Sequence, residues 1–149
     1  MIDDSKTTPR RLWRDGLDMF DAAVVLIERA KKSNKEEMRL LFPTYYLLGH
    51  GIEVTLKAVL RENGSSLDEL KNVIRHDLNK AAQRVVKLKL DQLSGFVENH
   101  ITLVQRLNQY YSAKVFEYRE PGHMRLPPIE ELLLFFDGLH NLINRCLKK

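Results

Sequence analysis

The chain has 149 residues, of which 44% are hydrophobic and 30% charged, a balance typical of a soluble globular protein with one domain. This length allows a single core without disulfides or metals, and the only cysteine, Cys146, excludes an intrachain disulfide and a cysteine-based zinc site. The net charge of +4 is too small to indicate nucleic-acid binding by itself.

The first eight residues are polar and acidic where a secretory signal has a basic start and an apolar run. We therefore expect a flexible lead over residues 1–8 and a single domain over residues 9–149. No stretch approaches the roughly 18 apolar residues that a membrane-spanning helix needs. These features predict a cytoplasmic protein that does not associate with a membrane.

Two long helices are expected in the first half of the domain. Residues 9–32 form the first, because apolar residues recur at alternating spacings of four and three: Trp13, Leu17, Phe20, Val24 and Ile27. After a polar turn at residues 31–37, residues 38–63 form the second, kinked or begun near Pro43 and ended by Gly64. The second helix is apolar nearly all round, so it should be central.

Three ionisable residues interrupt the apolar second helix. His50, Glu53 and Lys57 follow one another at spacings of three and four, so they share one side of the helix. The neighbouring Gly49 and Gly51 each cost roughly 1 kcal/mol in a helix interior, which suggests that another backbone approaches closely there. One interpretation is that Glu53 orients His50 as a general base. The favoured one is a structural polar track in which Glu53 and Lys57 satisfy each other.

Two side chains mark the starts of the next helices. Ser66, with Glu69 three positions later, has the form of a capping box and opens a short helical turn. Asp77 is expected to cap the helix that begins near residue 77, and capping explains the His76-Asp77 pair better than a functional role for His76.

The segment from residue 71 to residue 89 is basic. A stripe with few acids between its members contains Lys71, Arg75, Lys80, Arg84, Lys87 and Lys89. Such a stripe can bind a phosphate backbone while tyrosines stack on bases. The alternative is an ordinary solvated helix face.

The second half of the domain is expected to contain two more long helices. Periodic apolar residues predict one over residues 91–111, and turn signals predict an irregular loop over residues 110–128. Pro128 then opens the last helix. The fold class is therefore an all-α antiparallel bundle of four long helices plus a short helix.

Four sequence segments, taken in order, resemble the HEPN superfamily over about residues 13–147. They are Gly-Ile-Glu-Val-Thr-Leu-Lys-Ala-Val-Leu at 51–60, His-Asp-Leu at 76–78, Leu-Asn-Gln-Tyr-Tyr at 107–111 and Phe-Glu-Tyr-Arg at 116–119. The resemblance implies a small helical bundle that often dimerises and associates with nucleotides or RNA. Many members are ribonucleases of toxin–antitoxin and defence systems, and others are non-catalytic partners of nucleotidyltransferases.

The catalytic signature of that superfamily is an arginine followed, after four to six residues, by a histidine near the start of the final helix. Arginine stabilises the phosphate and histidine moves a proton. The nearest candidates are Arg119 and His123, but only three residues separate them and Pro121-Gly122 places them in a loop. This departure argues against ribonuclease activity and favours Arg119 as a structural clamp of the loop.

We therefore expect a HEPN-like, nucleotide- or RNA-associated homodimer that is non-catalytic or weakly catalytic, in a toxin–antitoxin, defence or nucleotidyltransferase-partner system. One alternative is a metal-independent endoribonuclease that uses Arg119 and His123. Another is a pure accessory subunit, bound to an antitoxin or nucleotidyltransferase partner. No cofactor or metal is expected, because the histidines are scattered without a pair at helical spacing. The candidate binding residues are Lys80, Arg84, Lys87, Tyr111, Tyr118 and Arg119.

Overall fold

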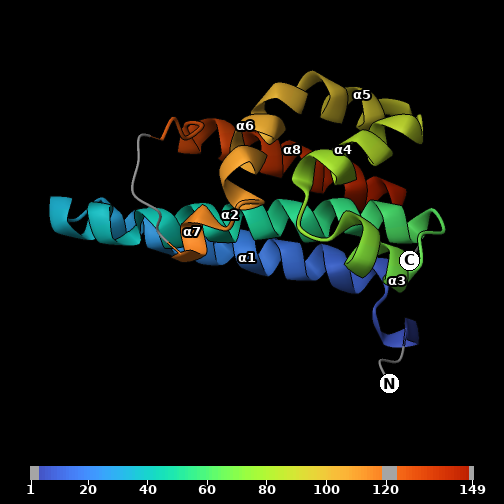
Figure 1. Cartoon of the computed structure of the whole chain (residues 1–149), viewed down its shortest axis with the longest axis horizontal. Helices are drawn as coiled ribbons and strands as arrows, with labels where there is room; N and C mark the ends of the chain where they lie inside the picture. Colours follow the sequence, from blue (N-terminus) through green and yellow to red (C-terminus); the bar gives the residue numbers. More distant parts are fainter. Residues whose placement is uncertain (1–3, 119–123, 148–149) are drawn as a thin grey trace.

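The computed structural model describes residues 4–118 and 124–147, and within these ranges every regular element is a helix. The elements pack into an all-α bundle (Figure 1). In chain order they are η1 (Asp4–Lys6), α1 (Pro9–Ala30), α2 (Asn34–Glu62), α3 (Leu67–Glu69), η2 (Leu70–Ile74), α4 (Leu78–Lys87), α5 (Asp91–Asn99), α6 (Ile101–Tyr111), α7 (Val115–Tyr118) and α8 (Ile129–Cys146).

Helix α2 is central, as its composition predicts. It packs against α1, α4, α6, α7 and α8, and most of its side chains from Leu48 to Leu60 are buried. In Figure 1, α1 lies along one side of α2, while α4, α5, α6 and α8 lie on the other side. None of the helices in the described ranges is long and apolar enough to cross a bilayer.

Helix α2 begins at Asn34, four residues earlier than expected, and Pro43 lies inside it. The side chain of Ser33 accepts a hydrogen bond from the backbone N–H of Glu36 at 3.1 Å and so caps the helix. Two glutamates in the first turn also interact favourably with the positive end of the helix dipole. Residues 31–33 of the polar run form the expected turn, whereas residues 34–37 are the first turn of the helix.

Glycines allow α1 and α2 to approach closely. A Cβ atom on Gly51 would lie 3.3 Å from the carbonyl oxygen of Gly16, which confirms the expected backbone contact at this position. A Cβ atom on Gly16 would lie 2.1 Å from Thr55 Oγ1. At Gly49 the neighbour is instead the ring of Tyr111, 2.5 Å from such an atom, so this glycine accommodates a side chain and not a backbone.

The single helix expected over residues 91–111 is divided at His100, whose φ and ψ are −110° and 13°. The Nδ1 atom of His100 donates to the carbonyl oxygen of Phe96 at 2.8 Å, and its backbone N–H bonds to Val97 instead, at 3.1 Å. The side chain thus takes the acceptor that a continuous helix would use for the backbone. After the break, α5 packs on α4 and α8, while α6 packs on α4 and α2.

The short turn expected after Ser66 extends into a wide π-type turn. Ser66 caps α3 as predicted, accepting from the backbone N–H of Glu69 at 3.1 Å. The chain then continues as η2, where the backbone N–H of Arg75 donates to Leu70 O, five residues back, at 3.0 Å. Arg75 itself has a φ of 55°, in the region that favours glycine. This turn carries Arg75 and His76 to the side of α2.

Helix α8 is held to α1 by reciprocal contacts between Trp13 and His140. Their rings stack at 4.0 Å, Trp13 Nε1 donates to the His140 carbonyl oxygen at 3.1 Å, and His140 Nε2 lies 3.3 Å from the Trp13 carbonyl oxygen. Burial lowers the pKa of His140, and the hydrogen bond to Trp13 opposes this effect only in part.

The lowered pKa of His140 predicts an acid-dependent loss of stability. An unfolded histidine titrates near pH 6.5 and binds more protons than buried His140 below that pH, so the free energy of unfolding falls as the pH drops through this window. We expect His140→Phe to have a shallower slope than the wild type, by up to about 1.4 kcal/mol per pH unit. Urea denaturation between pH 5 and pH 7.5 measures both slopes, and equal slopes would contradict the prediction.

Candidate functional site

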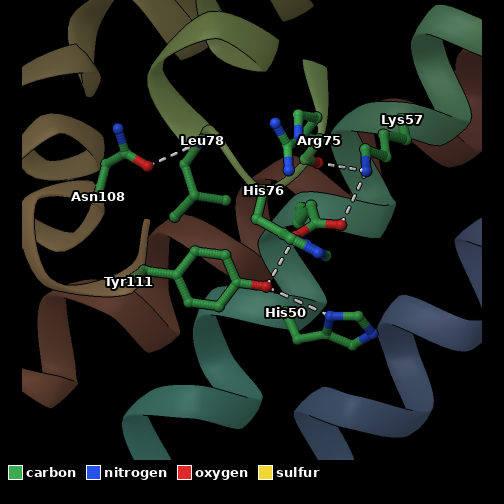
Figure 2. A network of polar contacts seen from close by, with 8 residues as sticks. His50, Lys57, Arg75, His76, Leu78, Asn108 and Tyr111 are labelled. Carbon is green, nitrogen blue, oxygen red and sulfur yellow. Dashed lines mark hydrogen bonds and ion pairs between the residues drawn. The ribbon is translucent and has the colours of Figure 1, made fainter. Parts of the chain in front are cut away.

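The carboxylate of Glu53 is the centre of a buried polar network (Figure 2). On α2 itself, Lys57 Nζ donates to Glu53 Oε2 at 2.8 Å, the ion pair that the sequence predicts. The other oxygen, Oε1, lies 2.9 Å from Nδ1 of His76 and accepts the hydroxyl of Tyr111 at 2.7 Å. The network therefore joins α2, the turn before α4, and α6.

The network keeps Glu53 ionised. Burial alone raises the pKa of this carboxyl, but the charge of Lys57 and hydrogen bonds from Lys57, His76 and Tyr111 outweigh burial and hold the pKa below its usual range. Because an ionised carboxylate can only accept hydrogen bonds, Nδ1 of His76 must be the donor. The second ring nitrogen of His76, Nε2, is left for other partners.

Lys57 also holds the unusual turn at Arg75. Its Nζ donates to the carbonyl oxygen of Arg75 at 2.6 Å, beside its bond to Glu53. A non-glycine residue at this φ costs of the order of 1–3 kcal/mol and persists only where its surroundings hold it. Two residues one turn apart on α2, Glu53 and Lys57, thus fix two consecutive residues of the turn, His76 and Arg75.

The start of α4 is attached to α6 in a similar way. Asp77 Oδ1 accepts the backbone N–H of Lys80 at 3.0 Å, which confirms the predicted cap, and it also accepts Asn108 Nδ2 at 3.1 Å. Asn108 Oδ1 in turn accepts the backbone N–H of Leu78 at 2.8 Å. The capping carboxylate therefore already has two partners within the fold.

A polar groove of about 680 Å³ borders this network at Arg75 and His76. Among the residues that the structure describes, four cationic side chains and one carboxylate, that of Asp77, line it. The side chain of His76 is 56% exposed, whereas that of its partner Glu53 is 3% exposed. The full lining is Lys71, Asn72, Val73, Ile74, Arg75, His76, Asp77, Lys80, Ser112 and Lys114. A half-exposed imidazole with a buried carboxylate behind it can donate, accept or carry a proton in this groove.

A second hollow, of about 650 Å³, lies where α1 turns into α2. It is lined by Val24, Val25, Glu28, Arg29, Lys32 and Glu36. Two of its charged groups pair with each other, Glu36 and Arg29 at 3.5 Å, and Glu36 also binds Arg39, outside the lining, at 2.5 Å. Without a convergent set of polar groups, this hollow is a weaker candidate than the groove.

His50 belongs to the network but does not bond to Glu53 directly. Its Nδ1 lies 3.3 Å from the hydroxyl oxygen of Tyr111, which in turn donates to Glu53. The ring of His50 also stacks on Tyr46, with centroids 6.0 Å apart. Since Tyr111 lies between the two residues, Glu53 does not orient His50 as the general-base interpretation requires.

The other candidate binding residues lie in different places. Lys80 lines the groove, Arg84 pairs with Glu69 of α3, and Lys87 is exposed at the end of α4. Tyr111 is 5% exposed, so its ring does not offer a face for base stacking. Tyr118 ends α7. The proposed catalytic pair, Arg119 and His123, lies outside the described residues.

Sequence reasoning missed the part of the groove that comes from the end of α6. Ser112 and Lys114 line it from the turn between α6 and α7. The sequence offers no signal for them, because one serine and one lysine in a turn are ordinary. Among the residues that the structure describes, no group of three or more His, Cys, Asp or Glu residues could hold a metal ion.

The groove and its buried network therefore form the candidate site. No family model, curated protein or solved structure matches this chain.

Proposed function

We propose that the protein binds phosphate groups of RNA or nucleotides in the polar groove, as a HEPN-like module that is non-catalytic or weakly catalytic. The observation that carries the proposal is the charge of the described part of the lining, four cations against one carboxylate that already has two partners. Phosphate is the common biological group that matches such a lining, because lysine and arginine neutralise it and release its counterions.

The way in which the groove is built supports this proposal. Its wall is a backbone turn whose carbonyl and imidazole are held by buried residues of α2. A binding site whose groups are already in place loses less conformational entropy when a ligand arrives. The groove lining also contains the amide of Asn72, which donates one N–H to Asp68 and keeps a second for a phosphate oxygen.

The first test removes two cations from the groove. In Lys71→Ala/Lys80→Ala we expect weaker binding of a fluorescent 20-nucleotide RNA, and a slope of log affinity against log salt that is smaller by about two, one for each lost phosphate contact. Fluorescence anisotropy between about 50 and 200 mM salt measures both quantities. The physical reason is that each lysine that neutralises a phosphate releases counterions on binding.

The matched control is Lys32→Ala/Lys35→Ala, which makes the same change in charge at the turn between α1 and α2. Lys35 and Lys57 are 22 residues apart along α2, which places the control roughly 30 Å from the groove. This variant should keep the wild-type affinity and salt slope. Equal losses in the two variants, or no salt-sensitive binding by the wild type, would refute the proposal.

The remaining expectations stay predictions. The resemblance to the HEPN superfamily implies a homodimer, which light scattering at micromolar concentration checks. It also implies a setting beside a nucleotidyltransferase or an antitoxin, which co-purification with the neighbouring gene product checks.

A further inference from the structure

We infer that His76 is a phosphate ligand of the groove and that it binds phosphate through Nε2 as an imidazolium, so that binding takes up a proton. This inference rests on the proposed function and names the group that would make phosphate binding depend on pH. The ligand is a phosphate group, which either an RNA backbone or a free nucleotide can supply.

The ring of His76 is held in one orientation. The Oε1 atom of Glu53 accepts a hydrogen bond from Nδ1 of His76. Because this carboxylate is ionised, Nδ1 keeps its proton in both charge states of His76. Only Nε2 can then gain or lose a proton. Neutral Nε2 is an acceptor and repels a phosphate oxygen, whereas protonated Nε2 donates a charge-assisted hydrogen bond to it.

The ring of His76 lies among charged groups. The charge of Glu53 is already matched by the ammonium of Lys57. Protonation of His76 therefore adds a positive charge to a groove that is already cationic. Among the described residues, the charged and titratable groups that line the groove around His76 or bond to its carboxylate partner are Glu53, Lys57, Lys71, Arg75, Asp77, Lys80, Tyr111 and Lys114.

The proton on Nε2 of His76 is coupled to the phosphate that binds there. A phosphate oxygen at Nε2 accepts a hydrogen bond from the imidazolium and meets only a lone pair on the neutral ring. By thermodynamic linkage, if bound phosphate raises the affinity of His76 for a proton, protonation raises the affinity for phosphate by the same factor. Since an imidazole changes its charge between about pH 5 and pH 8, the affinity should change within this range.

The pH profile distinguishes the two sources of phosphate. A phosphodiester keeps one negative charge over this range, so RNA affinity should rise steadily as the pH falls. A terminal phosphate loses its second charge near pH 6, so its affinity should pass through a maximum. The steady rise is therefore the profile of an RNA backbone, and the maximum is that of a nucleotide.

The experiment uses the whole chain and two probes, a 20-nucleotide RNA with hydroxyl groups at both ends and adenosine monophosphate. Dissociation constants are measured from pH 5.5 to pH 8 at constant salt. For the RNA we expect the affinity of the wild type to rise by up to about tenfold per pH unit as the pH falls. His76→Gln keeps a donor for Glu53 but does not titrate, so its profile should be flat.

His100→Gln is the matched control, because His100 bonds to the backbone of α5 and does not line the groove. It should keep the wild-type pH slope. A flat wild-type profile, or a wild-type slope in His76→Gln, would overturn the inference while leaving salt-dependent binding, and hence the proposed function, intact. Loss of all salt-dependent binding by the wild type would overturn both.

A second measurement does not depend on a variant that folds. In the wild type, the ring proton resonances of His76 are followed by NMR through a pH titration with and without inorganic phosphate. Phosphate should shift the midpoint of this titration to higher pH, and an unchanged midpoint would overturn the inference.

Discussion

Glu53→Leu is expected to lower the free energy of unfolding by about 3–5 kcal/mol. The substitution removes the acceptor of a buried ammonium, that of Lys57, whose side chain is 11% exposed. It also leaves the hydroxyl of Tyr111 and Nδ1 of His76 without their carboxylate. Breaking a buried pair by removing one partner costs more than the pair itself contributes, because the other charge remains buried. Urea denaturation followed by circular dichroism at pH 7 measures the loss.

The matched variant is Glu53→Leu/Lys57→Met, which replaces both charges by apolar side chains. It should recover most of the stability, since an apolar pair of similar volume is often as stable as a buried ion pair. Recovery will be incomplete where the Arg75 carbonyl oxygen loses its bond from Lys57. A loss below about 1 kcal/mol in the single variant, or a double variant no more stable than the single one, would contradict the role of Glu53.

Gly16→Ala is expected to destabilise the protein by about 1–3 kcal/mol, although alanine is the better helix former. The new methyl group would lie 2.1 Å from Thr55 Oγ1 and 3.1 Å from Gly51 O, so α1 and α2 must separate. Gly95 of α5 is the control, because a Cβ atom there meets nothing within 4 Å. Gly95→Ala should therefore raise the stability by about 0.5–1 kcal/mol. Thermal and urea denaturation of the two variants measure the contrast.

Gly16→Ala/Thr55→Ala tests whether the contact with Thr55 is the cause. Removal of the threonine side chain gives the new methyl group room, so the double variant should be more stable than Gly16→Ala. The hydroxyl of Thr55 is buried and has no hydrogen-bond partner among the described atoms, so little polar bonding is lost with it. Equal stability of the Gly16→Ala and Gly95→Ala variants would show that the close approach of α1 and α2 is not energetically important.

The helices that the sequence predicts well are those that local chemistry defines. Ser66 and Asp77 cap their helices as expected, because a cap is a contact between residues three positions apart. The break at His100 was missed because a histidine that bonds to the carbonyl of Phe96 leaves the apolar periodicity unchanged. The start of α2 was missed because a polar first turn has the composition of a loop.

The same distinction separates the predicted and unpredicted parts of the site. The pair of Glu53 and Lys57 follows from their spacing on one helix. The other partners of Glu53 lie 23 and 58 positions along the chain, at His76 and Tyr111, and only the packing of α4 and α6 on α2 brings them there. Spacing cannot show such contacts, so the groove was seen in the sequence only as a basic stretch.

The attachment of the Arg75 turn to α2 has a consequence for how the protein responds to its environment. The groove wall is fastened to the most buried helix by Glu53 and Lys57, so wall and core form one cooperative unit and not a lid on a hinge. Whatever occupies the groove is then linked to the global unfolding equilibrium. A bound anion protects the whole bundle, and a loosened bundle releases the anion.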